Sequence, residues 1–226
     1  MKPATATAHA ADIKTAEVRQ TLNARANRYD VVSRLADDLA HEIKNPLNAI
    51  VVNLEVLRRK IDTGATQVAL ERTHVIDEEI ARLHLLVDQL LQLMRPAKAD
   101  ARPTALDEAL EDLRPLLEVQ AKAARAGFEL QSESDVFVRA ASDAVKFAVL
   151  NLITAIYVAP NVEHIRMVLG TKDDVAGITI AATPPTLEEP NEFLQAARML
   201  IEAAGGTMEI ADGTATLRIP TCSSFA

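Results

Sequence analysis

The sequence predicts a helical hairpin followed by a region in which helices and strands are mixed. Two apolar registers, each with steps of three and four residues and separated by a short turn, predict the hairpin. A helix-like segment that Gly127 closes, followed by the strand-like residues Phe128 and Leu130, predicts the mixed region. A chain of 226 residues is long enough for two modest domains of this kind.

The first register alternates steps of four and three residues, which is the pattern of a coiled-coil seam. Its members are Ala36, Ala40, Ile43, Leu47, Ile50, Leu54, Leu57 and Ile61. Residues 62–65 supply turn chemistry, and Pro96 ends a second register. The members of that register are Ile76, Ile80, Leu83, Val87, Leu90 and Met94. Two such narrow seams are poorly buried by one hairpin, so we expect a C2 homodimer that forms a four-helix bundle.

Composition narrows the class of protein. The hydrophobic content of 49% is that of a globular chain, and the net charge of -8 argues against nucleic acid or an anionic membrane as the main partner. The single cysteine, Cys222, can form no internal disulfide, which fits a reducing compartment. The sequence has neither a secretion signal nor an apolar run long enough to span a bilayer, so we expect a cytoplasmic protein. It also has no clustered metal ligands, so we expect no metal site.

The heptad register places His41 on the outside of the expected bundle. If Ala40 is an a position, His41 is at b and Asn45 is at f, so both side chains face water. An exposed imidazole on a rigid helix is a usable nucleophile. Pro46, five positions later, removes a helix hydrogen bond at a cost of about 3 kcal/mol. Such a residue indicates a local distortion kept for function, with a harmless kink as the alternative.

The segment HEIKNPL, with His41, Glu42, Asn45 and Pro46, resembles the phosphoacceptor box of bacterial sensor histidine kinases. The resemblance implies that His41 carries a phosphoryl group on a ring nitrogen. It implies that Glu42 orients or deprotonates the ring. It also implies that Asn45, one turn later, can position a water that attacks the phosphoaspartate of a partner.

The same resemblance implies that the partners are receiver domains of response regulators. Pairing specificity would rest on exposed residues of the bundle near His41. We expect these partner-binding residues to be Lys44, Asn48, Val52 and Glu55.

Residues 103–220 resemble the ATP-binding domain of the same kinases, which implies an α/β sandwich of a mixed sheet against helices. Residues 141–160 resemble the helix of the nucleotide box, 162–170 and 175–183 resemble paired strands, and 194–220 resemble the terminal helix and hairpin. The expected organisation is a disordered N-terminus (1–12), a dimerisation and phosphotransfer hairpin (13–96), a linker (97–102), the α/β domain (103–220) and a tail (221–226).

The nucleotide-binding residues of that family are replaced in this sequence. Ala155 stands where the family has its magnesium-binding asparagine, and Ala182 stands where it has its adenine-reading aspartate. Pro184 and Thr186 replace two glycines, and proline has no amide hydrogen with which to cradle a phosphate. Few residues then remain before the terminal helix, expected at 193–204, to form a nucleotide lid. We therefore expect no bound nucleotide, and Asn151 is the nearest alternative ligand.

These observations favour a histidine phosphotransferase of a phosphorelay, similar to the dimeric histidine phosphotransferases of bacteria. His41 would pass a phosphoryl group between receiver aspartates without ATP, and the receiver would supply Mg²⁺. The α/β domain would then serve as a docking surface and a brace. The alternatives are a response-regulator phosphatase that uses Asn45, a histidine kinase with a diverged ATP site, and a non-catalytic dimeric scaffold.

Overall fold

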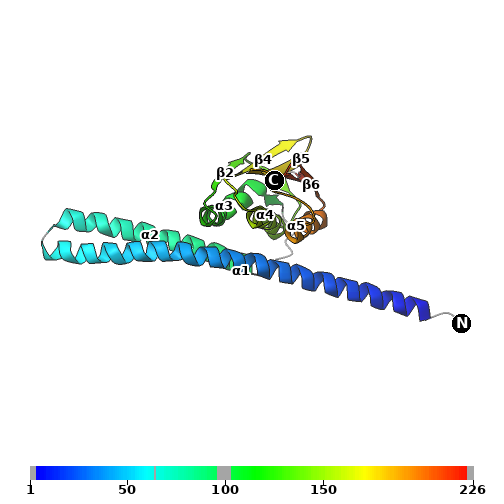
Figure 1. Cartoon of the computed structure of the whole chain (residues 1–226), viewed down its shortest axis with the longest axis horizontal. Helices are drawn as coiled ribbons and strands as arrows, with labels where there is room; N and C mark the ends of the chain where they lie inside the picture. Colours follow the sequence, from blue (N-terminus) through cyan, green and yellow to red (C-terminus); the bar gives the residue numbers. More distant parts are fainter. Residues whose placement is uncertain (1–3, 64, 96–102, 223–226) are drawn as a thin grey trace.

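The chain forms a long helical hairpin with an α/β domain packed against its first helix (Figure 1). The computed structural model describes residues 4–63, 65–95 and 103–222, and side chains from residue 25 onward within those ranges. Helix α1 spans Ala4–Asp62 and helix α2 spans Thr66–Met94. The predicted hairpin is therefore confirmed, while Pro96 and the expected linker at 97–102 lie outside the described residues.

Helix α1 begins much earlier than the sequence predicted. We expected residues 1–12 to be disordered and a helix from Ile13, but α1 already includes Ala4 and continues without a break through the hairpin. Alanine is the strongest helix former and recurs through this segment, and extending an existing helix costs far less than nucleating one. The N-terminal part of α1 thus projects as a rod beyond the end of α2 (Figure 1).

The α/β domain contains a five-stranded sheet and three helices. The sheet order is β2-β4-β5-β7-β6, with β2 parallel to β4 and the other neighbours antiparallel. The strands are β2 (Gly127–Ser132), β4 (His164–Lys172), β5 (Val175–Thr183), β6 (Thr207–Ala211) and β7 (Thr214–Pro220). A short pair, β1 (Thr104–Ala105) and β3 (Phe137–Val138), lies apart from the sheet. The expected mixed sheet is confirmed.

The three helices of this domain are α3 (Leu106–Ala123), α4 (Ser142–Val158) and α5 (Glu192–Ala203). They cover the face of the sheet that is turned toward α1 (Figure 1). The strands alternate buried and half-buried side chains, as one-sided burial requires, whereas residues 147–156 of α4 are all buried. Helix α4 is hydrophobic on every side because it is enclosed by the sheet, its neighbouring helices and α1.

Two boundaries of the α/β domain differ from the expected ones. Helix α3 ends at Ala123 and the left-handed residue after it is Arg125, with φ 57°, so Gly127 does not close the helix. Gly127 instead begins β2, where a Cβ atom would collide with the imidazole of His164. Backbone pairing also continues beyond Pro220, because the amide of Cys222 donates to the carbonyl of Phe137 at 2.8 Å.

The buried face of α1 is offset from the predicted seam. Within one chain, Leu39, Pro46 and Asn53 are buried, whereas the seam residues Leu47 and Ile61 are exposed. Helix α1 turns one face to α2 and another to the α/β domain, so the heptad pattern did not identify the face used within the chain. Of the predicted seam on α1, four members are exposed and four are half-buried. No helix within the described residues is long and apolar enough to cross a bilayer.

Candidate functional site

His41 lies on α1 with its side chain exposed, as the register predicted. Its neighbours Lys44, Asn45 and Asn48 are exposed too. Asp38, three residues before His41, is half-buried because α3 and α4 approach it from the α/β domain. His41 is therefore reachable from solvent, while the turn before it is partly covered.

Glu42 is buried, with 7% of its surface exposed, although it follows the exposed histidine. Its Oε2 accepts a hydrogen bond from Nζ of Lys122 on α3 at 2.6 Å and lies 3.9 Å from the guanidinium of Arg82 on α2. Its Oε1 accepts from Nδ2 of Asn45 at 3.3 Å. Three elements thus meet at one carboxylate beside the histidine.

Pro46 lies inside α1 and is buried. A proline at this position cannot donate to the carbonyl of Glu42, four residues earlier, so the helix lacks one backbone hydrogen bond directly after His41. The distortion expected from the sequence therefore falls on the residue whose side chain is held by Lys122.

The predicted partner-binding residues Lys44, Asn48, Val52 and Glu55 are all exposed on α1. Their steps of four, four and three residues place them along one side of the helix, running from His41 toward the hairpin turn. The structure brings them together with the histidine as one surface. Their role in binding stays a prediction.

The positions that replace nucleotide ligands lie apart from His41, in the α/β domain. Ala155 is 3% exposed within α4 and Ala182 is buried on β5, so both alanines pack into the core. Pro184 is exposed and Thr186 half-buried in the segment between β5 and α5. Asn191 caps α5 by accepting hydrogen bonds from the amides of residues 193 and 194, so this segment leads directly into a helix.

Asn151, the nearest alternative ligand, is already engaged. It is fully buried, its Nδ2 donates to the carbonyl of Phe147 at 2.8 Å, and its Oδ1 accepts from Nδ2 of Asn27 on α1 at 2.9 Å. Helix α1 is fixed to α4 at this point by further contacts. The guanidinium carbon of Arg28 lies 4.3 Å from the centre of the Phe147 ring and its NH2 atom 3.8 Å from the carboxylate of Asp143.

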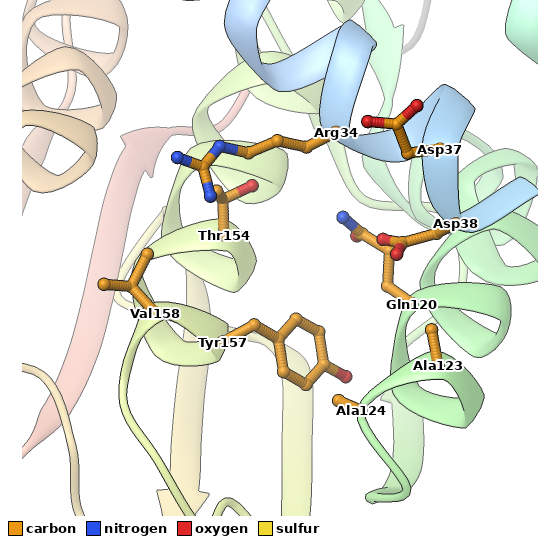
Figure 2. Close-up of a pocket in the computed structure, with 9 residues that line it drawn as sticks. All are labelled: Arg34, Asp37, Asp38, Gln120, Ala123, Ala124, Thr154, Tyr157 and Val158. Atoms are coloured by element: carbon orange, nitrogen blue, oxygen red, sulfur yellow. The ribbon is translucent and has the colours of Figure 1, made fainter.

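A cavity of about 330 Å³ lies between α1 and helices α3 and α4 (Figure 2). Burial and the neighbouring Asp37 raise the pKa of Asp38, which lines it, and burial raises the pKa of Tyr157. Gln120 is 3% exposed and its Oε1 has no hydrogen-bond partner within the described residues. The acidic lining disfavours a phosphate group.

Comparison with known proteins identifies the hairpin region of the chain. Residues 31–98 match the family model of the His Kinase A (phospho-acceptor) domain. The sensory histidine kinase/phosphatase NtrB of Vibrio alginolyticus is 30% identical over 155 residues, which cover 68% of this chain and 42% of that protein. Sporulation kinase D of Bacillus subtilis is 26% identical over 129 residues, covering 56% of this chain and 25% of that kinase.

Residues 31–98 therefore form a phospho-acceptor domain of the bacterial two-component histidine kinase family. The chain spans about a quarter to two fifths of the length of these histidine kinases. Among solved structures, it is similar to the Acinetobacter baumannii histidine kinase AdeS, with a TM-score of 0.47, 15% identity, and coverage of 80% of this chain and 97% of that one. The catalytic domain of histidine kinase ThkA gives a TM-score of 0.47 at 17% identity, covering 55% of this chain and 99% of that one.

Several residues around this site were not predicted from the sequence. Lys122 and Arg82 form ion pairs with Glu42, and Asn27 donates a hydrogen bond to Oδ1 of Asn151. Lys122 lies in the last turn of α3, where a lysine is ordinary because it complements the helix dipole, so it gives no local signal. Packing of the two domains brings Lys122 to Glu42 and Asn27 to Asn151, whereas Arg82 meets Glu42 within the hairpin.

Proposed function

We propose that this chain is a histidine phosphotransferase that moves phosphoryl groups between receiver-domain aspartates through His41, without using ATP. The observation that carries the proposal is that α4 offers no free side-chain ligand to a metal ion at Ala155 or Asn151. Ala155 offers no oxygen to a metal ion, and the amide of Asn151 is bonded to Asn27 of α1. His41 lies on α1, away from these positions, and its exposed imidazole can still act as a nucleophile.

The chemistry of the proposed reaction is balanced without a nucleotide. One ring nitrogen of His41 attacks the phosphorus of a receiver phosphoaspartate. An N–P bond forms as the P–O bond breaks, its electron pair returns to the aspartate, and the proton on the other ring nitrogen leaves to a base. A second receiver aspartate then attacks the same phosphorus, and the N–P bond breaks with its electron pair left on the ring nitrogen. The base returns the proton to the ring, so that neutral His41 is regenerated. Mg²⁺ held by the receiver neutralises the phosphoryl charge in both steps.

The proposed active form is a homodimer. Part of the predicted seam is exposed in the single chain, and Leu47, Leu54 and Ile61 expose 47%, 39% and 62% of their surfaces. An open row of large apolar side chains along a hairpin is the surface that a second hairpin would cover in a four-helix bundle. The exposed row of Lys44, Asn48, Val52 and Glu55 is the proposed contact with receivers.

A response-regulator phosphatase is the second candidate, and one observation favours it. Asn45 is exposed one helical turn after His41, where an amide can position a water for attack on a phosphoaspartate. Its Nδ2 makes only a long hydrogen bond of 3.3 Å to Glu42, so the amide has capacity for a water. The NtrB relative of Vibrio alginolyticus is named as both kinase and phosphatase.

One labelling experiment separates these functions. Receiver domains from the same organism are phosphorylated with ³²P-acetyl phosphate and incubated with the wild type, with His41→Gln and with Asn45→Ala. We expect acid-labile label on the wild type and on Asn45→Ala, and none on His41→Gln. Rapid loss of receiver label that depends on Asn45 would indicate a phosphatase. Receiver binding with neither transfer nor hydrolysis would indicate a scaffold.

The matched control is the same incubation with γ-³²P-ATP and Mg²⁺ in place of the receiver. We expect no label on the wild type, because α4 lacks the metal ligand at Ala155. Label that depends on His41 would make the chain an active histidine kinase and would overturn the interpretation of Ala155, Ala182 and Pro184.

A further inference from the structure

We propose that Lys122 is a positioning residue that holds the carboxylate of Glu42 away from His41, so that docking of the α/β domain slows phosphorylation of the histidine. We infer this on the basis of the proposed role of His41 as a phosphoryl acceptor. Lys122 belongs to α3 of the α/β domain, whereas Glu42 and His41 are neighbours on α1. A contact between domains therefore reaches the residue next to the nucleophile.

The geometry assigns both oxygens of Glu42 to other partners. Within the described residues, the polar partners of its side chain are Lys122 at 2.6 Å, Asn45 at 3.3 Å and Arg82 at 3.9 Å, and His41 is not among them. The Glu42 side chain is 9% exposed, whereas the Lys122 side chain is 56% exposed. Glu42 is thus directed into the groove between the domains, while His41 points to solvent.

The surroundings of this ion pair show that it depends on docking. A second cavity of about 360 Å³ separates α2 from α3 and is lined by Glu42 and Lys122 together with Arg82, Leu85, Pro115 and Glu118. Arg82 belongs to the hairpin and stays near Glu42 when the domains separate. Lys122 is carried away with α3. The shorter of the two cationic contacts is therefore the one that responds to domain movement.

The consequence follows from the proton that the reaction must remove. When one ring nitrogen of His41 forms the N–P bond, the proton on the other nitrogen has to leave. A nearby carboxylate is the natural acceptor, and a positioned base accelerates such a step by roughly 100-fold or more. With Lys122 in place, Glu42 does not reach the ring and the proton leaves to water. Without Lys122, Glu42 can turn toward His41 and accept it.

The first test uses phosphoramidate, a small phosphoryl donor that phosphorylates exposed histidines and needs no receiver. Its reaction with His41 is followed by mass spectrometry for the wild type, Lys122→Gln, Lys122→Arg and Lys122→Gln with Glu42→Gln. We expect Lys122→Gln to react about threefold to tenfold faster, below the full effect of a positioned base because Arg82 remains. Lys122→Arg, which restores the ion pair, should react at the wild-type rate.

The double variant distinguishes positioning from a merely structural role. If Lys122 acts through Glu42, the acceleration disappears when Glu42 is glutamine. An acceleration that persists in the double variant, or an unchanged rate in Lys122→Gln, would overturn the inference. Lys146→Gln is the matched control, because it breaks an ion pair of 2.8 Å with Asp112 inside the α/β domain and should leave the rate unchanged.

Failure of the proposed function gives a different pattern. If phosphorylated receivers label no variant but phosphoramidate gives the expected order of rates, the phosphotransferase proposal fails and the control of His41 by Lys122 stands. If receivers label the wild type but Lys122 has no effect with either donor, the phosphotransferase stands and the positioning role fails. No modification of His41 by phosphoramidate in any variant would overturn the positioning role as well.

Discussion

The hairpin and the α/β domain bury their apolar residues in opposite ways. In the α/β domain a single chain completes the core, and ten consecutive residues of α4, 147–156, are buried. In the hairpin large apolar side chains such as Leu47, Val51 and Leu70 stay on the surface. The difference teaches that one chain is sufficient to close the core of the α/β domain, to which α1 contributes, whereas the hairpin carries the surfaces that other chains would cover.

The largest expected effect comes from the closed core of the α/β domain. Leu150 is fully buried on α4, so Leu150→Ala should lower the free energy of unfolding by about 2–5 kcal/mol through lost contacts and a cavity. Urea unfolding followed by circular dichroism measures the loss. Met199→Ala on the exposed side of α5 is the control and should cost far less. Equal costs at the two positions would contradict the comparison.

The next effect is expected on the open face of the hairpin. Leu47→Asp should weaken the proposed dimer by about 100-fold, which is about 2.7 kcal/mol, because a charge would enter an apolar interface. Sedimentation velocity across a range of concentrations measures the shift toward monomer. Leu47→Met keeps the apolar surface and should leave the dimer intact. A wild type that stays monomeric at all concentrations would remove the basis of this prediction.

A smaller effect is expected where the two regions meet. NH2 of Arg28 donates to the carbonyls of Leu93 and Arg95, both at 2.6 Å, at the end of α2, and its guanidinium also stacks on Phe147 of α4. Arg28→Met should lower the free energy of unfolding by about 2 kcal/mol, because charge-assisted hydrogen bonds are lost. Amide hydrogen exchange should show faster exchange at the end of α2 and in α4 together. Faster exchange in only one of them would mean that Arg28 does not join the regions.

The smallest effect concerns Asp38 beside the cavity of Figure 2. Burial, followed by the charge of Asp37, raises the pKa of Asp38 above its ordinary value of 3.8. A raised pKa means that folding disfavours the ionised carboxylate. The folded protein therefore loses stability as pH rises above that ordinary value. Asp38→Asn should therefore raise the melting temperature slightly at pH 7 and not at pH 3.

The control for Asp38→Asn removes a charge elsewhere. Asp88→Asn on the exposed face of α2 makes the same change in net charge and should not reproduce the effect. A shift in melting temperature that is equal at both pH values, or equal in the two variants, would show that burial of Asp38 does not cause it.

Local patterns predicted much of this fold because they follow secondary-structure geometry. Steps of three and four residues predicted α1 and α2, and the two segments predicted as paired strands became β4 and β5, whose buried side chains alternate. The HEIKNPL motif predicted the phosphoacceptor domain, and the family match covers it. These features depend on residues that are close in sequence.

The burial of Glu42 and the face of α1 in contact with the α/β domain could not be predicted in this way. Glu42 and Lys122 are 80 positions apart, and no short pattern links them. The heptad pattern marks apolar residues on α1 but does not say whether α2, the α/β domain or a second chain covers each face. Leu39 is buried while Leu47 is exposed, although both are leucines on the same helix.

Asn53 helps to set which residues of α1 and α2 lie at the same level along the hairpin. It is a buried polar residue between α1 and α2, where its Oδ1 accepts from NH1 of Arg72 at 3.2 Å and its Nδ2 donates to the carbonyl of Ala49. Sliding one helix along the other would take Arg72 away and leave the buried Oδ1 of Asn53 unpaired, which is costly. The pair of Asn53 and Arg72 thus sets the longitudinal alignment of the two helices. This pair lies nearer the hairpin turn than Glu42, and the alignment that it sets keeps Arg82 opposite Glu42.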